Sequence, residues 1–109
     1  MKMYTSRDQT DKLIELGFEK PKGWCVEGIS SRLIMYKHKE DNEGFNYSIG
    51  ELLSFLPEFV NWTPRVIRGN VIEYSFETEG SELYYCNAHN ELIDNLYDMI
   101  LRLKEEGVI

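Results

Sequence analysis

Apolar residues recur at helical spacing in three stretches of the chain, and each stretch has recognisable start and stop signals. The central stretch begins at Ser48, a good N-cap residue that forms a capping box with Glu51. Pro57 ends it after about two turns, because proline has no N–H to donate and its ring excludes the preceding turn. Its apolar face holds Leu52, Leu53 and Leu56, followed by Phe59 and Val60. A helix this short is marginal alone, so we expect other elements to cover that face.

The first helical stretch follows the same rules. Ser6 and Gln9 form a second capping box, which predicts a helix that runs to about Leu16. Gly17 suits the left-handed position after a helix, and Phe18 can fold back on the last turn in a Schellman motif.

The longest predicted helix covers about residues 90–106 and ends at Gly107, after which Val108 can fold back in the same way. Its broad core stripe contains Leu92, Ile93, Leu96, Met99, Ile100 and Leu103.

The cleanest strand pattern lies at residues 71–77, followed by a second strand at 82–88. Alternation predicts that Ile72, Tyr74 and Phe76 face inward, and that Glu73, Ser75 and Glu77 face solvent. Two registers remain open for this hairpin. An odd-length loop groups the inward residues with Tyr84, Cys86 and Ala88, whereas a two-residue Gly80-Ser81 turn groups them with Leu83 and Tyr85. The concentration of apolar residues favours the first.

The remaining segments are less regular. Residues 24–26 are short and β-prone, and residues 32–37 read either as a strand paired with them or as one turn of helix. Pro64 restricts any strand around it to a sheet edge. The sequence therefore predicts one α+β domain over residues 1–109, with an antiparallel sheet packed against three helices in the order α-β-β-α-β-β-α.

Composition narrows the function classes. The apolar content of 42% argues against disorder, no apolar run is long enough to span a bilayer, and there is no signal peptide. Two distant cysteines do not make a disulfide framework, which favours the cytoplasm. Residues 1–39 carry a net charge of +3 and residues 40–109 carry −10, and this acidic field opposes nucleic-acid binding.

One constellation deserves testing as a metal site. Cys25, His38, Cys86 and His89 could fill a tetrahedral zinc shell, and Cys86-x-x-His89 has a plausible local spacing. No second close pair exists, however, and buried cysteine is commonly a small apolar core residue. We therefore expect neither a metal nor another cofactor.

Catalytic patterns are missing from the sequence. Ser6 and Ser48 are accounted for as helix caps, and no serine has a Gly-x-Ser-x-Gly setting. No glycine-rich loop ends in the Lys-Ser/Thr pair that phosphate binding requires. The sequence predicts a protein that is not an enzyme.

The surplus of aromatic residues is the better functional lead. Adjacent tyrosines in one strand point to opposite faces, so one of Tyr84 and Tyr85 must lie off the main core. Surplus aromatics suggest a surface for a partner, and self-association is its simplest form. The candidate interface residues are Trp62, Tyr74, Tyr84, Tyr85, Tyr97 and Leu101.

Three blocks of sequence carry a resemblance to a known group. They are the opening Tyr4-Thr5-x-x-x-Gln9-Thr10-x-x-Leu13-x-x-Leu16-Gly17, the central Tyr47-Ser48-Ile49-Gly50-Glu51-Leu52-Leu53 ending in Leu56-Pro57, and the closing Glu91-Leu92-Ile93-Asp94-x-Leu96-Tyr97-x-Met99-Ile100 with Gly107-Val108-Ile109. Together they resemble small uncharacterised proteins of gut Bacteroides-type bacteria and their prophages or mobile elements. Residues 23–46 depart from that pattern. The resemblance implies a small α+β fold, homodimer formation as one option, and no catalytic residue.

The sequence thus favours a non-enzymatic cytosolic interaction protein of phage or mobile-element origin that binds itself or a host protein. An acidic inhibitor that occupies the nucleic-acid site of a host enzyme is the alternative. It would use the strand carboxylates Glu73, Glu77, Glu79 and Glu82 with those of the last helix, and its binding would collapse with salt.

Overall fold

The computed structural model of the chain describes residues 2–21, 24–29, 32–37, 46–76 and 81–109, and along 24–29, 32–37 and 81–82 it describes the backbone alone. The class is α+β, as expected, with three helices and an antiparallel sheet. The expected order of elements is wrong in one respect: the described chain has the order α-β-β-α-β-β-β-β-α, with two further strands after the second helix.

The three predicted helices are present as α1 (Arg7–Glu15), α2 (Ile49–Phe55) and α3 (Leu92–Glu105). Both predicted capping boxes form: Ser6 with Gln9 at α1, and Ser48 with Glu51 at α2. The N-cap residue of α3, Glu91, makes no such side-chain hydrogen bond.

Both predicted Schellman ends are also confirmed. Gly17 and Gly107 adopt φ values of +97° and +75°, the left-handed region that only glycine enters without strain. The closing backbone hydrogen bonds run from Phe18 N to Leu13 O at 3.1 Å and from Val108 N to Leu103 O at 2.8 Å.

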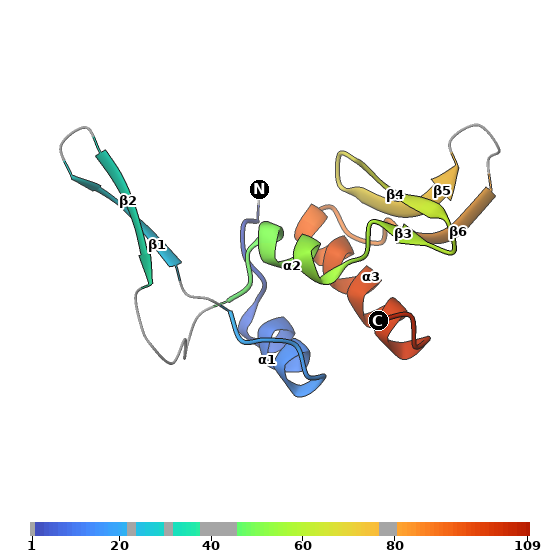
Figure 1. Cartoon of the computed structure of the whole chain (residues 1–109), viewed down its shortest axis with the longest axis horizontal. Helices are drawn as coiled ribbons and strands as arrows, with labels where there is room; N and C mark the ends of the chain where they lie inside the picture. Colours follow the sequence, from blue (N-terminus) through green and yellow to red (C-terminus); the bar gives the residue numbers. More distant parts are fainter. Residues whose placement is uncertain (1, 22–23, 30–31, 38–45, 77–80) are drawn as a thin grey trace.

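The strands form two separate antiparallel sheets (Figure 1). The two-stranded sheet pairs β1 (Trp24–Ile29) with β2 (Arg32–Lys37), so residues 32–37 are a strand and not a helical turn. The four-stranded sheet has the order β3-β4-β5-β6, from β3 (Phe59–Val60), β4 (Thr63–Arg68), β5 (Val71–Phe76) and β6 (Ser81–Cys86).

Strand β4 is the largest departure from expectation, because Pro64 lies inside it. Pro64 is opposite Phe59, while the backbone N–H of Arg65 donates to Glu58 O at 2.9 Å and pairing with β5 begins only at Arg65. Pro64 has no backbone N–H, and at its position neither neighbouring strand requires a donor.

The β5–β6 register matches the favoured alternative: Ile72 is opposite Cys86 and Tyr74 is opposite Tyr84. The expected odd-length loop is not the cause, because an even number of residues lies between the paired Phe76 and Ser81. Instead, the pairing is irregular at Tyr74/Ser75, where β6 has one extra residue. This extra residue brings the favoured faces of the two strands together.

The core lies where α3 packs against α2 and against β5 and β6 (Figure 1). The predicted stripe of α3 is buried at Ile93, Leu96, Met99, Ile100 and Leu103, and it meets Ile72 and Tyr74 of β5 and Leu52 of α2, all with no exposed surface. Among the described residues, no helix combines the length and the apolarity needed to cross a membrane.

Candidate interaction surface

The β3–β4 hairpin carries the most exposed large apolar side chain among the described residues. Two residues, Asn61 and Trp62, join the strands with φ values of +48° and +69°. Positive φ at both central positions defines a type I′ turn, in which Asn-Gly is the preferred pair. Here Trp62 occupies the glycine position, and 90% of it is exposed.

The base of this hairpin is held firmly. The Arg65 guanidinium donates from Nη1 to Leu56 O at 3.2 Å and to Leu53 O at 3.1 Å, and Leu53 O also accepts from the backbone N–H of Leu56, so Arg65 caps the C-terminal end of α2. The Tyr74 hydroxyl donates to Pro57 O at 2.6 Å. Val60 next to the turn is buried, so Trp62 projects from a fixed support.

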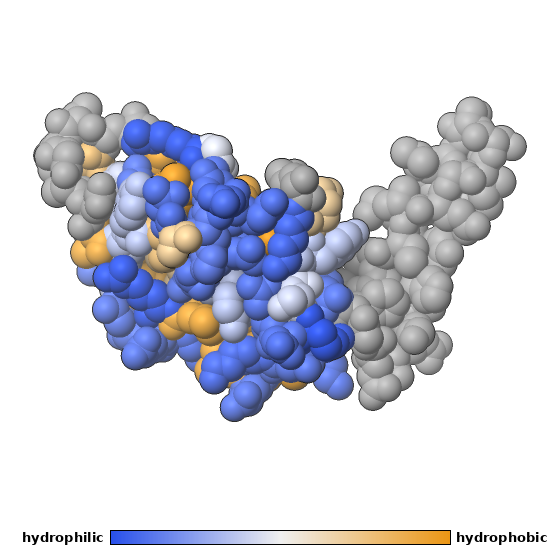
Figure 2. Space-filling model, turned by 180° about the vertical axis from the view of Figure 1, so that it is seen from behind, coloured by the Kyte–Doolittle hydropathy of each residue, from blue (hydrophilic) through white to orange (hydrophobic). Residues whose placement is uncertain are grey.

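Exposed apolar side chains are concentrated in this half of the molecule. Of the nine large apolar side chains that are exposed in the described residues, six belong to the four-stranded sheet and its turns, and no helix contributes one. The six are Phe59, Trp62, Ile67, Phe76, Leu83 and Tyr85. Seen from behind, the surface shows apolar side chains in patches among hydrophilic ones (Figure 2). Among the described residues, large exposed apolar side chains are thus found on the sheet and not on the helices.

The candidate interface residues from the sequence separate into two groups. Trp62 is 90% exposed and Tyr85 is 40% exposed. Tyr97 and Leu101 are half-buried and pack against the core. Their role in binding stays a hypothesis.

Two of the candidate tyrosines are engaged inside the molecule. Tyr74 has no exposed surface, so its assignment to an interface is corrected. It is a core residue whose hydroxyl donates a hydrogen bond to Pro57 O. Tyr84 lies edge to face with Tyr74, with ring centroids 6.4 Å apart, and the Arg102 guanidinium lies 5.1 Å from its ring centroid. A hydrogen bond to Glu106 raises the pKa of Tyr84.

The expected acidic strand face is also corrected. Glu73 is only 7% exposed, because Val66 and Tyr85 flank it on the neighbouring strands, and it pairs with Arg68 at 3.0 Å. Glu77, Glu79 and the side chain of Glu82 lie outside the described residues. The strand carboxylate that is described thus offers little surface for mimicry of nucleic acid.

The proposed metal ligands do not form a site in the part of the chain that is described. There, no three His, Cys, Asp or Glu side chains lie close enough to hold a metal ion. His89 Nε2 lies 2.8 Å from Asp98 Oδ2, and burial raises the pKa of the half-buried Cys86 thiol, which keeps it protonated and poorly nucleophilic. The Cys25 side chain and His38 lie outside the described residues.

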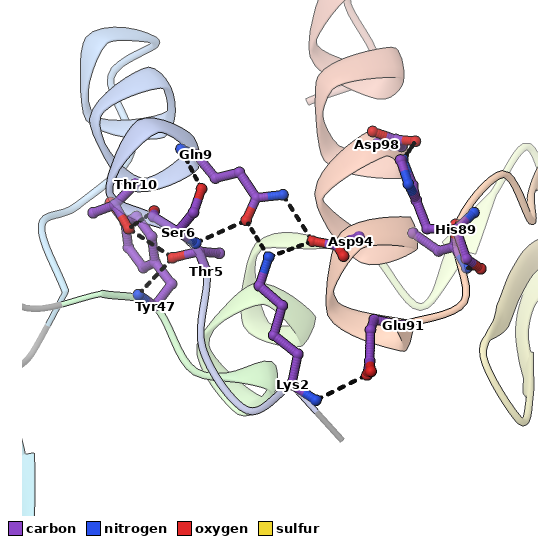
Figure 3. Close-up of polar contacts among 11 residues, drawn as sticks. Lys2, Thr5, Ser6, Gln9, Thr10, Tyr47, His89, Glu91, Asp94 and Asp98 are labelled. Carbon is purple, nitrogen blue, oxygen red and sulfur yellow. Dashed lines mark hydrogen bonds and ion pairs between the residues drawn. The ribbon is translucent and has the colours of Figure 1, made fainter.

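A polar junction joins the N-terminal segment to α1 and α3 (Figure 3). Lys2 Nζ donates to Asp94 Oδ1 at 2.7 Å, and Gln9 Nε2 donates to the same oxygen at 2.9 Å. Although burial acts to raise it, these hydrogen bonds lower the pKa of Asp94. Since the groups satisfy one another, the junction has a structural role.

A second polar cluster was missed by the sequence analysis. Asn95 of α3 has no exposed surface, and its amide nitrogen donates to Asn70 O at 2.6 Å and His89 O at 3.0 Å, while its oxygen accepts from His89 N at 3.0 Å. The signal was a lone amide within the apolar spacing of the last helix. Asn95 fastens the β4–β5 turn and the β6–α3 connection to the helix, which is again structural.

The most exposed apolar feature of the described surface is the tip of the β3–β4 hairpin, where Trp62 is 90% exposed. Comparison with known proteins adds no identity: no protein-family model, no curated protein and no solved structure matches the chain.

Proposed function

We propose that this chain is a non-enzymatic, cytosolic protein-interaction module that inserts Trp62 into an apolar pocket of its partner. The resemblance of its capped helical blocks to small proteins of gut Bacteroides-type bacteria and their mobile elements supports an origin in such an element. The binding part of the proposal stands on Trp62 itself.

The observation that carries it is the combination of exposure and backbone conformation at Trp62. A left-handed conformation costs a non-glycine residue roughly 1–2 kcal/mol, and a side chain that is 90% exposed recovers almost none of this by packing. For folding alone, glycine would serve better at this position. Residues held in such strained positions cluster at binding and catalytic sites.

The tip also has the physical properties of a binding anchor. Tryptophan is among the residues that dominate interface energies, because its large rigid ring buries much area for little lost freedom. The Arg65 and Tyr74 hydrogen bonds fix the hairpin before binding, which reduces the entropy lost on association. The partner pocket should offer apolar contacts to the ring and one acceptor for the indole N–H.

Affinity capture tests the proposal. The immobilised wild-type chain is expected to retain a protein from a lysate of its source organism, and Trp62→Gly is expected to lose it. Met3→Ser is the matched control, because Met3 is also exposed, at 54%, but lies far from the hairpin in sequence. The retained protein should stay bound at about 1 M salt, because apolar burial is not screened.

Capture by Trp62→Gly at the wild-type level would contradict the proposal. Capture that disappears between low and high salt would instead support the acidic inhibitor.

A further inference from the structure

A groove lies between the C-terminal parts of α1 and α3. Its volume is about 470 Å³, and Lys12, Leu16, Leu101, Lys104 and Glu105 line it. This volume lies within the roughly 300–1,000 Å³ of typical binding pockets. Two leucines make part of the lining apolar, and two lysines bring ammonium groups to it.

The two ammonium groups outweigh the single carboxylate of Glu105 in the lining, on a protein that carries −7 overall. One of them is already placed over an aromatic ring: Lys104 Nζ lies 5.6 Å from the ring centroid of Phe18. A cation over an aromatic face is attractive, most of all over an indole. The groove therefore suits an occupant that combines aromatic rings with a negative charge.

The β3–β4 hairpin has that chemistry. Trp62 and Phe59 are 90% and 59% exposed, and the neighbouring Glu58 is also exposed. Building on the proposed function, we infer that the partner is a second copy of this chain, and that residues 58–62 of each copy dock in the α1–α3 groove of the other. Two such contacts related by a two-fold axis close a dimer. A single contact repeated head to tail would instead grow into filaments.

The surface available fits a weak dimer. With roughly 150–250 Å² for each fully buried aromatic side chain, the exposed parts of Trp62 and Phe59 from two tips give about 700 Å². The grooves add less than this, so the total stays below the ~1,200–2,000 Å² of stable interfaces and within the range of weak, transient ones.

Pairing of two sheets edge to edge is the competing arrangement, and the structure disfavours it. Strand β6 lies at one edge of the four-stranded sheet, but its pairing is irregular opposite Tyr74/Ser75. Irregular strand edges resist the addition of another strand. The tip and the groove remain as the complementary surfaces.

Mixing two variants tests the contact directly by sedimentation equilibrium. Trp62→Gly removes the anchor and leaves the groove intact, whereas Lys12→Glu/Lys104→Glu reverses the groove charge and leaves the tip intact. We expect the wild type to dimerise, each variant alone to associate at least about tenfold more weakly, and a mixture to form a 1:1 complex through its one intact contact. Two variants damaged on the same shared surface would not complement each other in this way.

A charge swap provides the control for folding. Glu58→Lys should weaken self-association when it is introduced into the wild type, and restore it when it is introduced into Lys12→Glu/Lys104→Glu. Only variants whose circular dichroism matches that of the wild type are compared. A wild type that stays monomeric up to about 1 mM, or variants whose mixture forms no complex, would overturn the docking. If such a monomer still captured a protein through Trp62, the proposed function would stand without self-docking; if capture failed too, both would fall.

Discussion

Two adjacent turns of the four-stranded sheet solve the same geometric problem with different residues. The β4–β5 turn is Gly69-Asn70, and the only positive φ, +60°, falls on glycine, as in a type II′ turn. The β3–β4 turn is Asn61-Trp62, and both residues have positive φ.

The two turns also differ in what surrounds them. The Asn70 side chain donates to His89 O, and its own carbonyl accepts from Asn95 of α3, so that turn is fastened to the helix. The Trp62 side chain is almost fully exposed. The first turn thus has its positive φ on glycine and is held by internal contacts, whereas the second has a positive φ on an exposed tryptophan, which the proposed function explains as the presentation of an indole ring.

The largest effect is expected where the fastened turn meets α3. Asn95→Ala leaves Asn70 O and the His89 N–H without their buried partner, whereas His89 O keeps the hydrogen bond from the Asn70 side chain. The free energy of unfolding should fall by about 3 kcal/mol, as measured by urea denaturation. Asn90→Ala, at an exposed position just before the helix, is the control and should change it by less than about 0.5 kcal/mol. A loss below about 1 kcal/mol for Asn95→Ala would refute the structural role.

The support beneath the Trp62 hairpin should weaken at high pH. Burial raises the pKa of Tyr74, whose hydroxyl donates to Pro57 O, from the ordinary 10.0 to about 12. The protonated hydroxyl is thus favoured in the folded state, so its contribution is complete below pH 10 and is lost as the pH rises towards 12. Tyr74 alone should lower the unfolding free energy by roughly 2–3 kcal/mol across this window.

The matched variant for this pH dependence is Tyr74→Phe. At neutral pH it should lose about 1 kcal/mol with the hydrogen bond to Pro57 O. Its decline between pH 10 and 12 should be smaller than that of the wild type. An unchanged decline would show that folding does not raise the pKa of Tyr74.

A smaller effect is expected at the glycine of the fastened turn. A methyl group on Gly69 would meet no atom within 4 Å, so Gly69→Ala tests the backbone alone. It should cost about 1–2 kcal/mol. Gly50→Ala, within α2 and with only Ser48 Oγ at 3.9 Å, should instead gain about 0.5–1 kcal/mol. Denaturation of both variants checks the opposite signs, and a stabilising Gly69→Ala would argue against a strained position.

The same contrast explains how much of the fold the sequence predicts. Helix ends depend on residues a few positions apart, so Ser6, Ser48, Gly17 and Gly107 could be assigned their roles correctly. Strand β4 could not be recognised because the contacts that hold it come from residues farther away in the sequence. The Arg65 guanidinium, for example, caps the end of α2, and no pattern within residues 63–68 indicates this contact. The Gly69-Asn70 dipeptide was a usable hairpin signal that the interpretation overlooked.

For the candidate site, the aromatic surplus identified Trp62 correctly as a surface candidate but placed Tyr74 beside it. Periodicity predicts which strand residues share a face, and it predicted that Tyr74 points inward. How much surface a tyrosine retains depends on the elements packed against it, which a pattern within one strand does not contain. Asn95 was missed for the same reason, since its partners come from two other connections.

The smallest of these effects tests the central claim most directly: the free energy of unfolding of Trp62→Gly relative to the wild type. Glycine adopts the positive φ without strain, which stabilises the folded chain, but it also gives the unfolded chain more freedom. The difference predicts that the free energy of unfolding rises by about 0.5–1 kcal/mol. Urea denaturation at a protein concentration low enough to exclude association measures it. A loss of more than about 0.5 kcal/mol would mean that the indole stabilises its own chain, and would contradict the claim that Trp62 is displayed for a partner.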